Sequence, residues 1–187
     1  MKDDKRDKAC VERLKEGDES ALKELFDAYY VPLCLYAVQL TDSLEVSEDL
    51  VQEVFISFWE RKAYRLLQSD LRSYLFAAIR HLALNYMRRE RPYALQDVEE
   101  ALFPAEWEEE DMTDDTLLRM RQKLNKALEA LSPQEYKVLQ LIVFKNKKYK
   151  EVAEEMGITV NSVKTYWARA LKYLRSQSLL SLLIYFC

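Results

Sequence analysis

The chain has 187 residues and a formal net charge of −4, with only two glycines and four prolines. Few helix breakers and abundant Leu, Ala, Glu, Lys and Arg favour an all-helical protein. The single histidine argues against a histidine-rich metal site or a conventional catalytic triad. Three widely separated cysteines, no signal peptide and no apolar run of roughly 18 residues predict a cytoplasmic protein with reduced thiols.

The charge is unevenly distributed along the chain. Residues 1–92 hold 15 basic and 17 acidic side chains, residues 93–116 hold ten acidic and none basic, and residues 117–187 hold 13 basic and five acidic. We therefore expect an all-α fold of two small helical domains joined by an acidic linker, the C-terminal domain containing a helix-turn-helix. The expected boundaries are residues 8–92 and 115–178 for the domains, 93–114 for the linker and 179–187 for an apolar tail.

Residues 1–8 have mixed charge and no apolar partner, so we expect them to be frayed. A first helix is predicted over residues 8–16, and a second follows with apolar positions at helical spacing. Pro32 predicts a break or the first turn of a third helix over residues 33–40, because proline lacks a backbone N–H.

Asp42, with Glu45 three residues later, predicts an N-cap and capping box for the next helix, which runs to about Arg61. Its predicted buried stripe is Leu50, Val51, Val54, Phe55 and Phe58. The opposite face carries Asp49, Gln52, Glu53, Ile56 and Trp59. Large apolar groups beside fixed charges suggest a protein interface. The alternative is a surface helix with Trp59 tucked under a neighbouring element.

A loop over residues 62–70 precedes a helix predicted from Leu71 to about Glu90. Its outer face carries Phe76, Arg80, His81, Asn85, Arg88 and Arg89. Arginines with an aromatic ring and an amide suit separated DNA strands, because they offer phosphate neutralisation, base stacking and hydrogen bonds to base edges. A solvated basic helix face is the alternative.

In the C-terminal half, Thr113 is a candidate cap for a helix that ends near Leu131. Ser132, Pro133 and Glu135 then predict the start of another helix, with a capping box and proline in its first turn. That helix is expected to run to about Phe144.

The segment YKEVAEEMGITVNSVKTYWARALKYLR, residues 149–175, contains two apolar helical faces separated by Gly157. Glycine adopts a left-handed conformation at little cost, so this pattern predicts a helix-turn-helix. The outer face of the second helix carries Asn161, Lys164, Thr165, Ala168, Arg169 and Lys172, and Lys147 and Lys148 add charge from the preceding loop. These side chains can reach base edges and phosphates in a major groove. The alternative is an amphipathic helix with a solvated basic face.

Residues 149–175 resemble region four of an extracytoplasmic-function sigma factor of bacterial RNA polymerase, and LSPQEYKVLQLIVFKN resembles the helix before it. Three further segments resemble region two of the same family: LKEGDESALKELFDAYYVPLCLYAVQLT, EDLVQEVF and RSYLFAAIRHLALNYMRRE. The likeness covers nearly the whole chain, in the right order.

The resemblance implies a sigma factor that binds core RNA polymerase, recognises −35 and −10 promoter elements and promotes strand opening. It places the outer face of residues 48–60 on the β′ clamp helices, residues 71–90 on the −10 element and the helix-turn-helix on the −35 element. It also implies contact with the β flap, a membrane-associated anti-sigma factor, and a loop at 62–70 that holds a flipped base. His81 and Asn85 stand where many members have Asn and Asp, so the base preference is expected to differ. No catalysis, cofactor, metal or small-molecule substrate is predicted.

Two other functions remain open from the sequence. One is a duplex-binding helix-turn-helix regulator with an N-terminal sensor or dimerisation domain, and the other is an interaction protein that does not contact DNA. The tail, residues 179–187, is expected to extend the last helix. It would either pack near Trp167 and Leu171 or cover a binding surface of the free protein.

Overall fold

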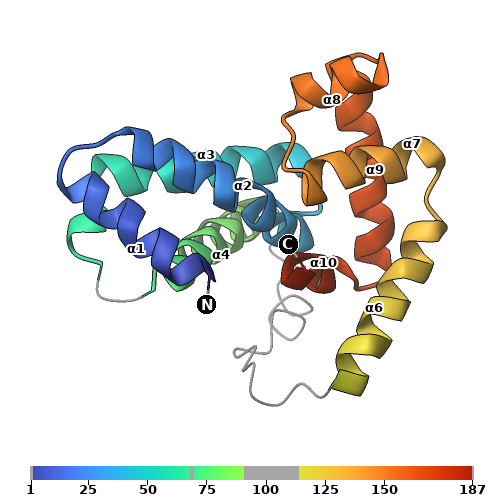
Figure 1. Ribbon diagram of the computed structural model, residues 1–187, viewed down its shortest axis with the longest axis horizontal. Helices are drawn as coiled ribbons and strands as arrows, with labels where there is room; N and C mark the ends of the chain where they lie inside the picture. The colour runs from blue at the N-terminus through green and yellow to red at the C-terminus, as the bar shows by residue number, and fades with distance from the viewer. Residues whose placement is uncertain (1, 68–69, 91–113, 187) are drawn as a thin grey trace. The chain divides into compact units, whose positions relative to one another are not determined.

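The computed structural model describes residues 2–67, 70–90 and 114–186, with side chains described over 5–67, 70–90 and 118–184. The predicted acidic linker lies outside these residues. The described residues form helices and no strand, so the all-α prediction is confirmed (Figure 1). Contacts divide the chain into two compact units, Met1–Met87 and Arg88–Cys187.

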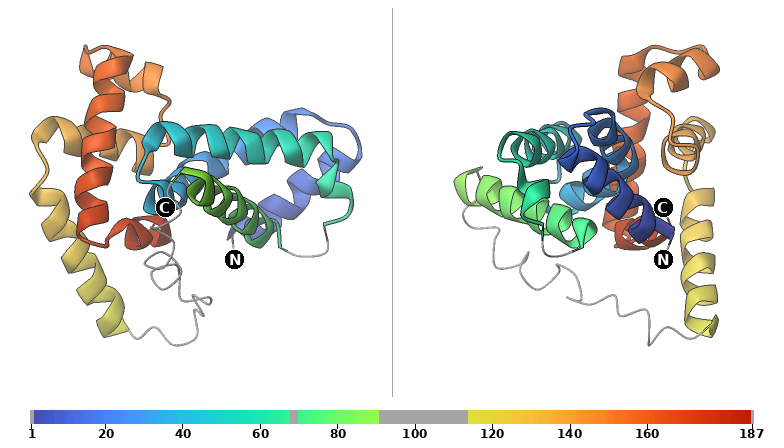
Figure 2. Two further views of the ribbon diagram at one scale, coloured as in Figure 1. Left: turned by 180° about the vertical axis from the view of Figure 1, so that it is seen from behind. Right: turned by 60° about the vertical axis from the view of Figure 1, so that its left-hand side comes forward.

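The first unit is built from α1 (Lys2–Lys15), α2 (Ser20–Thr41), α3 (Leu44–Glu60), the 3-10 turn η1 (Ala63–Arg65) and α4 (Leu71–Glu90). Helix α2 packs against both α1 and α3 (Figure 2). The predicted buried stripe of α3, Leu50, Val51, Val54, Phe55 and Phe58, is buried. Phe58 contacts Tyr74 of α4 at a ring-centroid distance of 5.6 Å, so α4 shares the same core.

The prediction of a frayed N-terminus is wrong, because α1 begins at Lys2. Its anchor is Asp7, whose side chain is buried, forms an ion pair with Arg6 and accepts a hydrogen bond from the Tyr29 hydroxyl. Burial and the Asp7 carboxylate raise the pKa of Tyr29, which keeps the hydroxyl protonated as the donor. A buried charge needs such partners, so this contact fixes α1 to α2.

The predicted break at Pro32 is also wrong, because α2 continues through it to Thr41. The residues on both sides of the proline, Val31 and Leu33 to Val38, are all buried. Packing of this helix on two neighbours outweighs the cost of the missing proline hydrogen bond, which sequence pattern alone cannot weigh.

The longer α2 also changes the predicted cap of α3. Asp42 is the left-handed residue that ends α2, with φ 56°, and its N–H donates to the Val38 carbonyl at 3.1 Å. Ser43 caps α3 instead, because its hydroxyl accepts from the Val46 N–H. The predicted cap is therefore wrong by one position, and the predicted capping box with Glu45 is wrong, because the third residue of α3 is Val46.

The second unit contains α6 (Asp114–Glu129), α7 (Pro133–Leu139), the π-helical segment η3 (Gln140–Phe144), α8 (Tyr149–Met156), α9 (Val160–Ser176) and α10 (Leu180–Phe186). Helices α7 and α8 both pack against α9. Trp167 of α9 is 1% exposed and is among the largest fully buried side chains. The sequence predicted helix to about Phe144 but not that its last turn would be π-helical.

Two predicted helix boundaries are confirmed in this unit. Ser132 accepts from the Glu135 N–H at 3.3 Å while the Glu135 carboxylate accepts from the Ser132 N–H at 3.0 Å, with Pro133 in the first turn. Gly157 ends α8 in the left-handed conformation, with φ 64°. The Ile158 N–H then donates to the Ala153 carbonyl at 3.0 Å, which completes a Schellman turn before α9.

The tail does not extend the last helix as predicted. Helix α9 ends at Ser176, and Ser178 adopts φ 54°, so the chain turns before α10. The Leu179 N–H donates to the Leu174 carbonyl at 3.0 Å, and both side chains are buried. Helix α10 packs against α6 and α9 of its own unit, which agrees with the packing alternative for the tail.

Candidate nucleic-acid interface

The outer face of α9 has the composition that major-groove binding requires. Its buried face, centred on Trp167 and Leu171, is covered by the rest of the unit. The opposite face presents Asn161, Lys164, Thr165, Arg169 and Lys172 as exposed side chains, with Ala168 half-buried. All six predicted α9 residues therefore lie on one surface, and α8 crosses α9 at its N-terminal end (Figure 1).

Local contacts already orient several of these side chains. The Lys164 ammonium lies 5.5 Å from the centre of the Tyr149 ring of α8. The Thr165 hydroxyl donates to the Asn161 carbonyl at 2.9 Å. Thr159 caps α9 by accepting from the Ser162 N–H at 3.1 Å. The N-terminal turns of α9 are thus fixed by α8 and by their own cap.

The two loop lysines have different surroundings. Lys147 forms a close ion pair with Glu155 of α8, and Lys137 of α7 lies 3.6 Å from the same carboxylate. The pKa of Lys147 is raised by this hydrogen bond, and the pKa of Glu155 is lowered by it. Lys148 has an exposed side chain, and its backbone N–H donates to Glu151 at 2.7 Å. A phosphate contact by Lys147 must therefore compete with Glu155.

The predicted DNA-facing residues of α4 do not form one continuous face, because the buried Leu84 and Met87 lie between them around the helix. Arg80, His81, Arg88 and Arg89 are exposed. Asn85 is half-buried and its amide nitrogen lies 3.3 Å from the His81 ring.

Phe76 of α4 is half-buried. It lies 5.4 Å from the Tyr36 ring and 5.5 Å from the Arg72 guanidinium. Its ring is therefore partly occupied before any base could stack on it.

The outer face of α3 differs from those of α4 and α9, because it is acidic and apolar. Asp49, Gln52 and Glu53 are exposed, and Ile56 is 56% exposed. Trp59 is half-buried and stacks on Tyr64 at 5.8 Å, so it contributes an edge to this surface.

Glu48 precedes this face and is buried, where it accepts a hydrogen bond from the Tyr30 hydroxyl at 3.0 Å. It therefore belongs to the core between α2 and α3. Helical spacing alone could not reveal Tyr30 as its partner.

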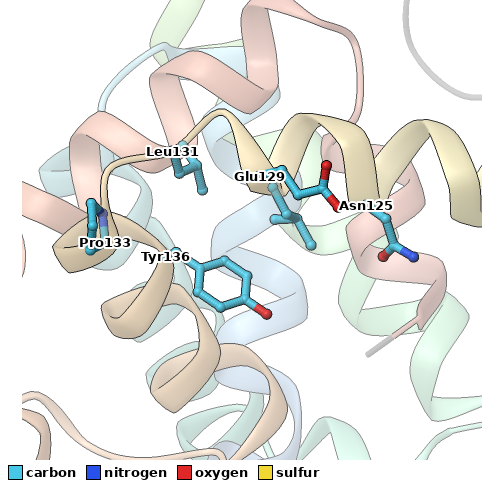
Figure 3. Close-up of a pocket in the computed structure, with 6 residues that line it drawn as sticks. Asn125, Glu129, Leu131, Pro133 and Tyr136 are labelled. Carbon is cyan, nitrogen blue, oxygen red and sulfur yellow. The ribbon is translucent and has the colours of Figure 1, made fainter.

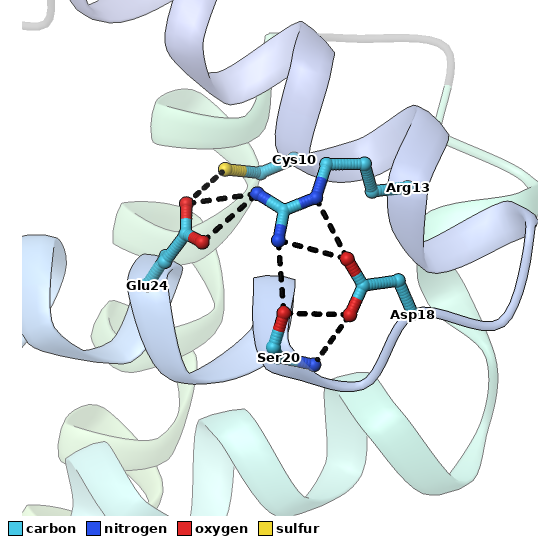
Figure 4. Close-up of polar contacts among 5 residues, drawn as sticks. All are labelled: Cys10, Arg13, Asp18, Ser20 and Glu24. Atoms are coloured by element: carbon cyan, nitrogen blue, oxygen red, sulfur yellow. Dashed lines mark hydrogen bonds and ion pairs between the residues drawn. The ribbon is translucent and has the colours of Figure 1, made fainter.

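A polar network at the corner of α1 and α2 was not apparent in the sequence (Figure 4). The Arg13 guanidinium donates to Glu24 at 2.9 Å, to Asp18 at 2.8 Å and to the Ser20 hydroxyl at 2.9 Å. Hydrogen bonds from Ser20 and Arg13 lower the pKa of Asp18, and burial raises the pKa of the adjacent Cys10 thiol. The network joins the two helices.

The turn between α6 and α7 contains a hollow of about 460 Å³ (Figure 3). Its lining includes Leu128, Leu131, Pro133 and Tyr136, with Asn125 and Glu129 at its polar edge. Tyr136 is 40% exposed. The hollow is a mixed polar and apolar surface outside the α9 face.

A basic outer face on the second helix of a helix-turn-helix defines a DNA-binding protein. Two family models match this chain: Sigma-70 region 2 over residues 25–93 and Sigma-70, region 4 over residues 121–174. The chain is also 26% identical to the RNA polymerase sigma factor YlaC of Bacillus subtilis over 159 residues, which is 80% of this chain and 87% of that protein.

The chain is also similar to two solved structures. CnrH in complex with the cytosolic domain of CnrY shows 20% identity, a TM-score of 0.38 and coverage of 92% of this chain and 97% of that one. The sigma factor RpoE in complex with the anti-sigma factor NepR from Bartonella quintana shows 25% identity, a TM-score of 0.33 and coverage of 85% and 96%.

The chain belongs to the extracytoplasmic-function group of the sigma-70 family, whose members direct promoter recognition in transcription initiation. None of its described helices is long and apolar enough to cross a membrane.

Proposed function

We propose that three helix faces divide the work of this sigma factor. The outer face of α3 binds the β′ clamp helices of core polymerase, the outer face of α4 binds the separated −10 element and the outer face of α9 reads the −35 duplex. The domain around α2 to α4 spans residues 8–92, and the helix-turn-helix domain spans residues 115–178. An acidic linker at 93–114 connects them.

The contrast in chemistry between the three faces supports this division best. An exposed isoleucine among two carboxylates and an amide on α3 suits a protein surface and would repel phosphates. Four exposed cationic or imidazole side chains on α4, and three exposed cations with an amide on α9, suit DNA. If these helix faces were solvated surfaces without partners, there would be no reason for acidic side chains to lie on α3 and basic ones on α4 and α9.

Family membership also supports partners beyond promoter DNA. We propose that the C-terminal unit contacts the β flap and that a membrane-associated anti-sigma factor binds the free protein. The protein then acts in the cytoplasm, where its polymerase resides, and it acts by binding rather than by catalysing a reaction.

The residue assignments are tested with core polymerase and a promoter that the complex selects from a random duplex library. Arg169→Ala should lose about 1–3 kcal/mol of binding at the preferred −35 sequence and discriminate less between −35 variants. Lys123→Ala removes an exposed charge from α6 of the same unit and serves as the control. Equal losses on every −35 variant would show that Arg169 contacts phosphate only.

The α3 assignment has a separate test. Asp49→Arg and Gln52→Ala should weaken binding to core polymerase while leaving the thermal midpoint unchanged, because both side chains are exposed. A large fall in the thermal midpoint would show that these residues hold the fold rather than the polymerase.

A further inference from the structure

Lysines from α7 and from the loop before α8 converge on one carboxylate at the side of the helix-turn-helix. Lys137 lies 3.6 Å from one carboxylate oxygen of Glu155, and Lys147 forms a close ion pair with the other oxygen. The hydrogen bond from Lys147 and the charges of Lys147, Lys137 and Lys145 lower the pKa of Glu155, so Lys145 acts on the same group. We call Lys137, Lys145 and Lys147 the lysine cluster.

The lysine cluster has more positive charge than its partner carboxylate can balance. In the described part of the chain, Glu155 is the one carboxylate that forms an ion pair with any of the three lysines. The charge of Glu151 also contributes to the raised pKa of Lys147, after that of Glu155, but the Glu151 carboxylate already accepts the Lys148 backbone N–H at 2.7 Å. Lys145 and Glu155 are exposed. An anion from outside the protein can therefore approach the cluster.

The backbone under the lysine cluster is fixed by the fold. The Lys147 N–H donates to the Leu141 carbonyl at 3.0 Å, and Leu141 is fully buried. Asn146 adopts φ 49°, so the chain turns tightly between Lys145 and Lys147. Lys137 stands on α7, which packs against α9. Groups that are already held together lose less conformational freedom on binding than mobile side chains do, so the cluster is prepared for a ligand.

Phosphate is the anion that this arrangement fits best. Lysine binds phosphate as a compact charge with three donors, and a phosphate group offers several acceptor oxygens to more than one lysine. In helix-turn-helix complexes the first helix crosses the DNA backbone while the second lies in the major groove. Glu155 stands on α8, the first of these helices, and α8 packs against α9. A duplex bound by α9 would therefore bring its backbone to the side where the cluster lies.

We propose that the lysine cluster binds a backbone phosphate of the duplex beside the −35 element, and that Glu155 occupies this phosphate site in the free protein. The Glu155 carboxylate is then an internal anion that the duplex displaces. Exposed ion pairs contribute little to stability, so the exchange does not require α8 to unfold. Because the ligand is a phosphate, the contact adds affinity without reading a base. This inference rests on the proposed function of α9.

The test compares Glu155→Gln with Glu154→Gln, which removes the same charge from the adjacent exposed position of α8. Each full-length variant is bound to core polymerase, and its affinity is measured for the library-selected promoter and for −35 variants of it. Glu155→Gln should tighten binding by about fivefold, the upper end of what an exposed ion pair contributes, and equally on every −35 variant. Glu154→Gln should change the affinity by less than about twofold.

Two further measurements locate the contact. Adding Lys137→Ala to Glu155→Gln should remove part of the gain, because the released ammonium of Lys137 supplies some of it. Single phosphates of the −35 duplex are also replaced in turn by neutral methylphosphonates. The gain from Glu155→Gln should disappear when the phosphate that faces the cluster is neutral, and it should persist at the other positions.

Several results would overturn the phosphate site. Equal gains from both glutamine variants would show a general effect of charge, and a gain that survives neutralisation of every phosphate would exclude the DNA backbone. Tighter binding of Glu155→Gln to core polymerase itself would assign the cluster to a protein partner. If the wild type with core polymerase shows no preference among −35 variants, the proposed function of α9 fails. If that preference is present and Glu155→Gln gains nothing, the phosphate site alone fails.

Discussion

Replacing Gly157 tests how the turn before α9 is built. Its φ of 64° and ψ of 34° lie in the left-handed region, while a Cβ added there would meet no atom within 4 Å. The cost of Gly157→Ala is therefore conformational and not steric, about 1–2 kcal/mol. Alanine also lowers the conformational entropy of the unfolded chain, which offsets about 0.4–1 kcal/mol of this cost. The expected net loss is about 1 kcal/mol in the free energy of unfolding.

Related variants separate backbone strain from packing. Gly157→Asn should cost less than alanine because asparagine tolerates the left-handed region, and Gly157→Val should cost more. Ser178 occupies the equivalent position after α9, with φ 54°, so Ser178→Gly should stabilise the same unit by up to about 1 kcal/mol.

Native-state hydrogen exchange of the α8 and α9 amides measures these effects within the C-terminal unit. The order valine, alanine, asparagine, glycine should hold from least to most protected. Equal losses for asparagine and alanine would show that the left-handed backbone is not the cause. When fully folded, Gly157→Asn should keep the wild-type preference for −35 sequences, because the outer face of α9 is unchanged.

Three further predictions follow from individual contacts. Glu155→Gln releases Lys147 and should steepen the dependence of duplex binding on salt by up to about 0.9 in log–log slope; an unchanged slope would mean that Lys147 does not reach phosphate. Tyr29→Phe leaves the buried Asp7 carboxylate without its hydroxyl donor and should cost about 1–3 kcal/mol in urea unfolding; a neutral result would remove Asp7 as the anchor of α1. Truncation after Ser178 removes the α10 contacts with α6 and α9 and should lower the thermal midpoint without tightening core polymerase binding; tighter binding would support masking by the tail instead.

Local signals were sufficient where one chemical requirement decided the structure. Backbone groups at a helix end have no partner within the helix. The capping box at Ser132 and the left-handed Gly157 each supply such partners through a local pattern, and both predictions are confirmed. The apolar stripe of α3 was likewise readable, because its spacing matches one helical face. The family resemblance, which segments in both halves of the chain supported, indicated the function.

The errors arose where distant contacts outweighed local preference. Pro32 and the charged first residues looked like breaks, but burial of α2 and the Asp7 contact with Tyr29 keep both segments helical. The continuation of α2 then moved the α3 cap from Asp42 to Ser43. A short sequence window around the N-terminal segment does not contain Tyr29, and one around Pro32 does not contain the helices that pack against α2.

In the candidate sites, too, local spacing predicted some features, and contacts between distant residues decided the others. Helical spacing placed the predicted residues of α3 and α9 on common outer faces, because 3.6 residues per turn determines which side chains share a side. It could not show that Lys147 pairs with Glu155 of another helix, or that Phe76 packs between Tyr36 and Arg72.

The most direct test of the account is transcription by core polymerase from promoters selected out of a random duplex library. With this protein added, the account predicts transcripts whose templates share two separated sequence elements, with permanganate-reactive bases at the downstream one. Arg169→Ala should relax selection only at the upstream element, and Arg80→Ala should weaken selection or opening only at the downstream one. Tight binding of the protein alone to a single palindromic duplex, with no transcription when core polymerase is supplied, would contradict the account.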